Sequence, residues 1–237
     1  MRLDSYLVEN GYFESRNRAL EAIKSGKVFV DGRVVKPSLK YDDSMRLEVV
    51  NEKFYVSRAG RKLESFFDEY PLVVQEKKAL DIGSSTGGFA QILLERDVSS
   101  LVCVDVGCNQ LHNSLRQKSN LRLFEETDIR DFSDEGGFEL ITCDVSFISL
   151  LEIIDHIDRM AYGDIVLLYK PQFEVGKNVK RDSKGVVQDR DAIRYNMQKF
   201  EDKAKELGWR QHYKRLCEIK GKEGNEEYFY HFTKDDL

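Results

Sequence analysis

From residue 57 onward, short apolar segments alternate with stretches of helical periodicity, and this alternation limits the possible folds more than any other feature. Apolar strands separated by helices predict an α/β domain whose mostly parallel sheet is covered on both faces. Only a short turn separates the last two strands, which predicts an antiparallel edge. Strands are expected over 78–81, 101–105, 121–124, 140–144, 165–169, 212–219 and 227–232, and helices over 88–95, 150–160 and 189–206.

The beginning of the chain follows a different order, with two helices before a hairpin. Ser15 is a suitable cap for the second helix, and Gly26 can end it. Asp31-Gly32 lies between two β-branched segments, which is a strong signal for a two-residue hairpin turn. A further short strand is expected over 45–50, so this region is predicted to be a small α+β domain.

We therefore expect a small domain at 1–50, a linker at 51–57 and a larger domain at 58–237. The net charge of −5 is unevenly distributed, because residues 1–62 carry a net +4 and the remainder carries −9. A positive small region joined to an acidic larger one suggests contact with a polyanion. A chance imbalance on a solvated surface is an equally good explanation of the charge alone.

The motifs of the small domain resemble the S4 RNA-binding domain over about residues 1–50. The matching residues are Arg2-Leu3-Asp4, Ser15-Arg16 followed by Ala19 and Ile23, Gly26-Lys27-Val28 and Val30-Asp31-Gly32. The resemblance implies two helices that present basic side chains to structured RNA, in salt-dependent contacts that read little sequence. The alternative role of these side chains is surface solubility. The candidates for RNA contact are Arg2, Arg16, Arg18, Lys24, Lys27 and Arg33.

A glycine-rich turn follows the first strand of the larger domain. The segment 79–89 resembles the cofactor motif of class I (Rossmann-like) methyltransferases that use S-adenosylmethionine. Glycines let the backbone approach a ligand closely, and the next helix offers free N–H groups. The Gly-x-Gly-x-x-Gly spacing of dinucleotide sites is absent. The candidate cofactor residues in this segment are Asp81, Gly83, Ser84, Thr86, Gly87, Gly88 and Phe89.

Two acidic residues follow the next two strands and are further candidates for cofactor binding. Asp105 can accept hydrogen bonds from a ribose diol, and Asp128 can accept one from an adenine amino group. Each acid alone is an ordinary loop carboxylate. Their position after successive strands, in register with the glycine turn, favours the functional interpretation.

Four charged residues, Lys62, Asp144, Lys170 and Glu227, lie near the glycine turn or at the ends of strands. With the surrounding segments 57–63, 143–149 and 169–174 and the S4-like beginning, they closely resemble the hemolysin A (TlyA) family over nearly the whole chain. The resemblance implies an S4 domain, an FtsJ-like methyltransferase domain and a Lys-Asp-Lys-Glu tetrad that maps onto these four residues.

Two details of the tetrad differ or are ambiguous in this chain. Glu226 is adjacent to Glu227, but strand alternation places only one of them in the site, and the family's spacing favours Glu227. Ala59 stands where many relatives have a glycine, and we expect it to affect the loop that leads to Lys62.

The tetrad suits methyl transfer to a ribose 2′-hydroxyl, a weak acid whose attack on a sulfonium methyl benefits from a base. A lysine acts as a base only after losing its proton, and burial and a neighbouring ammonium both favour the neutral amine. We expect Lys170 to be the base, assisted by Lys62, while Asp144 and Glu227 hold the lysines and orient the ribose. Two structural ion pairs are the alternative, although a lysine is costly to bury at the end of an apolar strand.

Residues 171–188 show little periodicity and directly follow Lys170. Loops of this length are often functional or disordered. We expect a loop on the substrate side that gains order on RNA, and it carries Lys177, Lys180, Arg181 and Lys184.

The resemblance implies a cytidine of large-subunit ribosomal RNA as the target, and some longer members also act on the small subunit. This chain is similar to the shorter form, so we expect the large subunit alone, acted on by a monomer. Methylation in this family is associated with sensitivity to ribosome-binding cyclic peptide antibiotics. The alternatives are a non-catalytic RNA-binding protein with a relic methyltransferase fold and a pore-forming hemolysin.

Composition excludes several other classes. No segment approaches about 18 consecutive apolar residues, so we expect no membrane span. The beginning of the chain lacks the apolar core of a signal peptide. The four cysteines have no metal-ligand spacing and are expected to be reduced thiols of a cytoplasmic protein without a metal.

Overall fold

The computed structural model describes residues 1–13, 15–50 and 53–234. The chain divides into two compact units, Met1–Phe54 and Tyr55–Leu237. The predicted linker lies partly outside the described residues. In the described part of the chain, no helix has both the length and the apolar character needed to cross a membrane.

The first unit contains two helices and a three-stranded antiparallel sheet in the order β2-β1-β3. Ser15 caps the second helix as predicted, because its hydroxyl accepts a hydrogen bond from the Arg18 N–H at 3.4 Å. Gly26 follows that helix with a φ of +73°, a backbone conformation that glycine adopts without strain. The elements are α1 (Leu3–Glu9), α2 (Arg16–Lys24), β1 (Val28–Val30), β2 (Arg33–Val34) and β3 (Leu47–Val49).

The second unit is built on a seven-stranded sheet in the order β6-β5-β4-β7-β8-β10-β9. The first five strands in this order, from β6 to β8, run parallel to one another, whereas β10 runs antiparallel to both β8 and β9. The α/β class and the antiparallel edge are thus confirmed. The strands are β4 (Lys78–Ile82), β5 (Ser100–Val104), β6 (Leu121–Phe124), β7 (Phe138–Cys143), β8 (Ala161–Tyr169), β9 (Arg210–Leu216) and β10 (Tyr228–Thr233).

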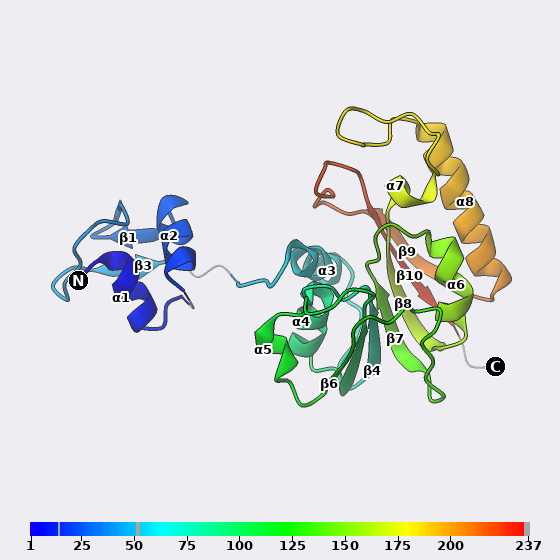
Figure 1. The fold of residues 1–237 in the computed structure, drawn as a ribbon, viewed down its shortest axis with the longest axis horizontal. Coiled ribbons are helices and arrows are strands. Elements are labelled where there is room, and N and C mark those ends of the chain that lie inside the picture. Colours follow the sequence, from blue (N-terminus) through cyan, green and yellow to red (C-terminus); the bar gives the residue numbers. More distant parts are fainter. Residues whose placement is uncertain (14, 51–52, 235–237) are drawn as a thin grey trace. The chain divides into compact units, whose positions relative to one another are not determined.

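Helices cover both faces of this sheet (Figure 1). Side chains on one face pack against α3, α4 and α5, and those on the other face pack against α6 and α8. Strand alternation explains the division, since Leu80 and Ile82 belong to the second layer and Ala79, directly before Leu80, belongs to the first. The helices are α3 (Arg58–Glu69), α4 (Gly88–Glu95), α5 (Asn113–Arg116), α6 (Leu150–Asp158), α7 (Pro171–Glu174) and α8 (Arg190–Glu206).

The pairing of β10 with β8 positions the candidate site. Tyr228 pairs with Tyr169 at the start of an antiparallel register. Because the strands run in opposite directions, Glu227 and Lys170 lie just outside the same end of this pair. Asp144 follows β7, the other neighbour of β8, at the same end.

Two local expectations are wrong. The segment that leads to Lys62 is not a loop, because α3 begins at Arg58 and contains both Ala59 and Lys62. Its apolar face, which includes Leu63 and Phe66, is buried and stabilises the helix. The segment 171–188 is not irregular throughout, since it begins with α7 and contains an isolated bridge between Arg181 and Val187.

Candidate active site

The turn after β4 needs glycine at its first position. Gly83 has a φ of +76°, and a Cβ atom there would lie 3.1 Å from both the Asp144 carbonyl oxygen and Val145 Cγ1. The Asp144 N–H also donates a hydrogen bond to the Ile82 carbonyl at 3.0 Å. The ends of β4 and β7 are therefore held in close contact, which fixes Asp144 beside the turn.

The later glycines of the turn have a different role. A Cβ atom on Gly88 would lie 2.2 Å from Ser57 Oγ and 2.6 Å from the Gly60 nitrogen. Gly88 therefore allows α4 to pack closely against the beginning of α3. A Cβ atom on Gly87 would meet Leu115 Cδ1 at 2.4 Å, and Phe89 is buried in the same layer.

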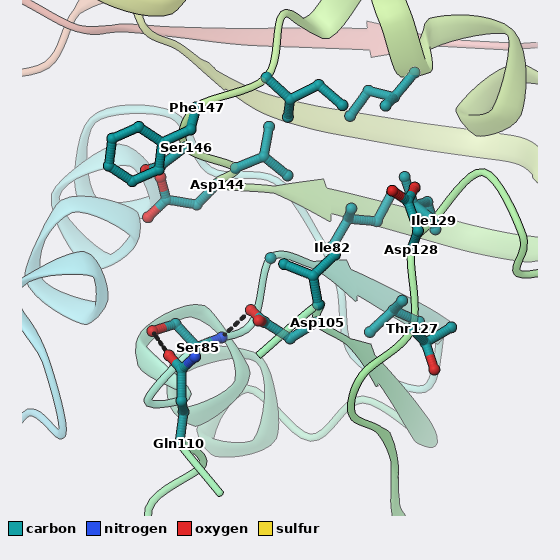
Figure 2. A pocket seen from close by; sticks show the side chains of 16 residues that line it. Ile82, Ser85, Asp105, Gln110, Thr127, Asp128, Ile129, Asp144, Ser146 and Phe147 are labelled. Atoms are coloured by element: carbon teal, nitrogen blue, oxygen red, sulfur yellow. Dashed lines mark hydrogen bonds between the residues drawn. The ribbon is translucent and has the colours of Figure 1, made fainter. Parts of the chain in front are cut away.

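A pocket of about 350 Å³ opens beside this turn (Figure 2). Figure 2 shows Ser85, Asp105 and Gln110 on one side of it, and Asp144, Ser146 and Phe147 on another. Of the candidate cofactor residues, Gly83, Asp105 and Asp128 line the pocket. The remaining candidates lie outside its lining, and they are Asp81, Ser84, Thr86, Gly87, Gly88 and Phe89.

Backbone donors hold the Asp105 carboxylate in the pocket wall. One oxygen accepts a hydrogen bond from the Ser85 N–H at 2.8 Å, and the other accepts one from the Gly107 N–H at 2.7 Å. Each oxygen retains a lone pair for a ligand hydroxyl. The neighbouring Gln110 side chain accepts a hydrogen bond from the Ser85 hydroxyl at 2.9 Å, a contact that the sequence did not reveal.

Asp128 lies in the pocket wall with a partner of its own. The guanidinium of Arg130 reaches both carboxylate oxygens, at 2.9 and 2.6 Å. These hydrogen bonds hold the pKa of Asp128 below its ordinary value. Asp128 is therefore a charged acceptor, and an adenine amino group would share it with Arg130.

Asp81 is fully buried below the pocket. It accepts a hydrogen bond from the Thr142 hydroxyl at 2.8 Å. Burial raises its pKa to about 7, although the Thr142 bond acts in the opposite direction. A direct ligand contact is not available to this side chain, because it has no exposed surface and does not line the pocket.

The first charged pair of the tetrad joins α3 to the segment before β10. Lys62 Nζ lies 2.6 Å from Glu227 Oε2, and both side chains are buried. Glu227 Oε1 also accepts a hydrogen bond from Gln172 Nε2 at 3.2 Å. A Cβ atom on Gly221 would come within 2.6 Å of the same oxygen, so the chain packs tightly around this carboxylate.

The second charged pair lies at the ends of β7 and β8. Lys170 Nζ lies 2.6 Å from Asp144 Oδ1, and it donates a hydrogen bond to Ser146 Oγ at 3.0 Å. Burial raises the pKa of Asp144, while the charges of Lys170 and Lys62 act against that rise. Glu227 raises it further. Because the other three charges all act on the Asp144 carboxylate, the structure brings the four side chains together.

Glu226 lies outside this site. It pairs with Arg190 at the beginning of α8, and Arg190 is 63% exposed. Strand alternation therefore separates the adjacent carboxylates in the way that the sequence predicts.

Phe147 is a notable residue that our sequence analysis did not select. Its ring is 91% exposed at the pocket, and its φ of +68° is uncommon for a residue with a side chain. The ring centroid lies 5.0 Å from that of Phe173, which follows Lys170 by three residues. The signal for Phe147 in the sequence was a large apolar residue directly after Asp144-Val145-Ser146, where the predicted strand has ended.

The S4-like unit holds two of its candidate RNA ligands by a buried carboxylate. Asp4 is fully buried, and it pairs with Arg2 at 3.0 Å and with Arg16 at 2.7 Å. The Arg2 hydrogen bond is the main cause that lowers the pKa of Asp4 to about 2. Both guanidiniums remain about half exposed, so they can still reach a phosphate.

The other candidates for RNA contact in this unit differ in their neighbours and in their exposure. The Arg18 guanidinium lies 4.9 Å from the centroid of the Phe54 ring. Lys24 and Arg33 are exposed, and Lys27 is partly buried.

Arg181 holds the segment that follows Lys170. Its guanidinium donates hydrogen bonds to the backbone carbonyls of Gln172, Gly176 and Gly185 at 2.9 to 3.3 Å. The Arg181 guanidinium thus makes hydrogen bonds within the segment. The lysines of the segment, Lys177, Lys180 and Lys184, are exposed.

Comparisons with known proteins agree with this architecture. Residues 55–234 match the FtsJ-like methyltransferase family, and residues 1–47 match the S4 domain. The chain is 45% identical to the 23S rRNA (cytidine-2′-O)-methyltransferase TlyA of Campylobacter jejuni, covering 99% of this chain and 100% of that protein. It is 38% identical to the 16S/23S rRNA (cytidine-2′-O)-methyltransferase TlyA of Mycobacterium tuberculosis, covering 96% and 88%.

A solved structure from Streptococcus thermophilus, described as a candidate hemolysin, is also similar. It has a TM-score of 0.72 and 33% identity, and the match covers 100% of this chain and 89% of that one.

Proposed function

Because this chain belongs to the hemolysin A (TlyA) family, with an S4 domain followed by an FtsJ-like methyltransferase domain, we propose that it methylates the 2′-hydroxyl of a cytidine in large-subunit ribosomal RNA. S-adenosylmethionine is the methyl donor of the reaction. The observation that carries the proposal is the assembly of Lys62, Asp144, Lys170 and Glu227 beside the pocket.

The residues around the pocket fit S-adenosylmethionine. Gly83 has no side chain at the end of β4, where a Cβ atom would come too close to Asp144. Asp105 offers lone pairs for the ribose diol, and Asp128 offers a charged acceptor for the adenine amino group. When bound, this cofactor supplies an electrophilic methyl group on a sulfonium, and these residues fix where that group lies.

Lys170 is the proposed base. It is buried at the end of β8, and its amine is held by Asp144 and Ser146. Lys62, held by Glu227, adds a positive charge that stabilises a developing ribose oxyanion. Asp144 then balances the charge of Lys170 after it has accepted the proton.

Phe147 is proposed to contact the base of the target nucleotide. An exposed aromatic ring offers a stacking surface, and methylation at a 2′-hydroxyl requires that the nucleotide enter the site. The position of Phe147 at the pocket, with Phe173 supporting its ring, matches this requirement.

The S4 unit is proposed to bind structured RNA through Arg2, Arg16, Arg18, Lys24, Lys27 and Arg33. Since the substrate is ribosomal RNA, we place the enzyme in the cytoplasm and expect it to act as a monomer. Small-subunit RNA is an additional target of the Mycobacterium tuberculosis relative, and we propose that this chain does not share it.

Mapping of methylated nucleosides tests the proposed function. The purified protein is incubated with methyl-labelled S-adenosylmethionine and with large or small ribosomal subunits from a strain that lacks the gene. We expect 2′-O-methylcytidine at one position of the large-subunit RNA. A methylated base, or no label despite cofactor binding, would contradict the proposal, and label in the small subunit would contradict its restriction to the large one.

A further inference from the structure

We propose that Ser146 is a positioning residue that orients the Lys170 amine toward the substrate hydroxyl. The inference rests on the proposed function, and it adds a residue to the Lys-Asp-Lys-Glu tetrad. Ser146 lines the pocket, its side chain is exposed there, and Lys170 Nζ donates a hydrogen bond to its hydroxyl at 3.0 Å.

The direction of the amine lone pair is the central point. A neutral lysine amine has two N–H groups and one lone pair. Ser146 Oγ accepts a hydrogen bond from one N–H group of Lys170 at 3.0 Å, whereas Asp144 Oδ1 forms an ion pair with the amine at 2.6 Å. The directional hydrogen bond to Ser146 limits rotation of the amine, so the lone pair is confined to fewer directions. With Asp144 alone, rotation about the last bond of the side chain would spread the lone pair over other directions.

Ser146 is itself held in place by the backbone. The Asp144 N–H donates to the Ile82 carbonyl at 3.0 Å, and Gly83 packs against Asp144 and Val145. Phe147, with a φ of +68°, turns the chain directly after Ser146. The hydroxyl therefore has a fixed position relative to the end of β8, which a positioning role requires.

The proposed reaction accounts for all atoms and electrons. The O–H bond of the ribose hydroxyl breaks, and its proton moves to Lys170 Nζ. The oxygen forms a bond to the methyl carbon, and the carbon–sulfur bond breaks with its electron pair going to sulfur. Lys170 is then an ammonium that pairs with Asp144 and donates a hydrogen bond to Ser146.

Ser146→Ala is the direct test. The single-turnover rate with saturating RNA and S-adenosylmethionine should fall by about 10- to 100-fold, because the reacting groups lose their alignment. Affinities for RNA and cofactor should be unchanged. Ser146→Thr, which keeps the hydroxyl, should restore most of the rate, and Ser119→Ala, at an exposed serine on the turn before β6, should react like the wild type.

A second readout does not depend on methyl transfer. Acetic anhydride modifies neutral lysine amines, and the extent at Lys170 can be followed by mass spectrometry against pH. Ser146→Ala removes the hydrogen bond that holds the amine, so modification of Lys170 should be faster than in the wild type at the same pH. Asp144, which follows β7, pairs with Lys170, and Lys62 on α3 and Glu227 before β10 act on Asp144; these charges are the same in both proteins.

The outcomes separate the two proposals. If the wild-type protein binds cofactor but does not methylate RNA, the proposed function fails, whatever Ser146 does. If the wild type is active and Ser146→Ala matches its rate and its acetylation profile, the positioning role is wrong. A slow Ser146→Thr would also contradict it. If Ser146→Ala misfolds and loses cofactor affinity, Ser146→Cys takes its place in the same comparison of rate and acetylation profile. Cysteine is of similar size to serine but is a weak acceptor.

Discussion

Lys62 Nζ lies 2.6 Å from Glu227 Oε2, although the two residues are 165 positions apart in the sequence. Helix α3 supplies the lysine, and the segment before β10 supplies the carboxylate. The exposed fractions of the two side chains are 9% and 3%, so each charge depends on the other for compensation. The pair therefore connects the beginning of the methyltransferase unit to its last strand.

Replacing one of two adjacent glutamates should reveal this dependence. Glu227→Ala should lower the free energy of unfolding by about 3–5 kcal/mol, since it leaves Lys62 buried without a partner, and it should also impair methylation. Glu226→Ala is the matched control, and it should cost about 0–1 kcal/mol because its partner Arg190 is exposed. Urea denaturation followed by Trp209 fluorescence measures both. Equal losses would contradict the assignment of Glu227 to the site.

Phe147→Ala should impair RNA methylation without weakening cofactor binding. Loss of stacking on one base costs about 1–3 kcal/mol, which corresponds to a decrease in kcat/KM of roughly 5- to 150-fold. Tyr195→Ala removes another exposed aromatic ring, on α8, and should have no effect. A Phe147→Ala enzyme with normal kcat/KM for its RNA would show that the exposed ring has no part in recognition.

The buried Asp81 should give the fold a pH dependence. Its pKa rises from 3.8 to about 7 on folding, so between those values the folded chain holds a proton that the unfolded chain has released. The free energy of unfolding should therefore fall as pH rises through this window, by at most about 1.4 kcal/mol per pH unit. Asp81→Asn removes this titration, so its stability should change less with pH. Parallel curves for the two proteins would contradict the raised pKa.

Replacing an arginine that pairs with Asp4 should lower stability as well as RNA binding, unlike replacing an exposed candidate for RNA contact. Arg16→Ala should weaken RNA binding and also destabilise the S4 unit, because the buried Asp4 loses one of its two partners. Arg33→Ala, at an exposed position on β2, should weaken RNA binding with little change in stability. Binding isotherms at several salt concentrations and thermal unfolding together test this. Equal stability of the two variants would show that Arg2 alone compensates Asp4.

The sequence was sufficient to predict the fold class, the antiparallel edge and the proximity of the four charged residues. The reason is physical, because strand alternation and strand ends fix where Asp144, Lys170 and Glu227 must lie once the sheet is formed. The same alternation distinguished Glu227 from Glu226.

Features that depend on contacts formed only in the folded chain could not be predicted. Gly88 was interpreted as part of a ligand turn, but the atoms that forbid a side chain there belong to Ser57, directly before α3, and to Gly60 within it. Arg181 was one of the cations of the expected substrate loop, but its guanidinium donates hydrogen bonds to three carbonyls of its own segment. In both cases the residue type suggests a role, but only the tertiary structure determines which atoms the residue contacts.

The role of Lys170 as the base is the central claim, and Lys170→Ala tests it most directly. The measurement is the single-turnover rate of 2′-O-methylation with saturating RNA and S-adenosylmethionine, beside cofactor affinity by calorimetry. The control is Lys203→Ala, which removes a lysine on α8 that pairs with Asp155 on α6. We predict a loss of about 10²- to 10⁴-fold for Lys170→Ala with cofactor affinity retained. A rate near that of the wild type would contradict the account and leave positioning alone as the source of catalysis.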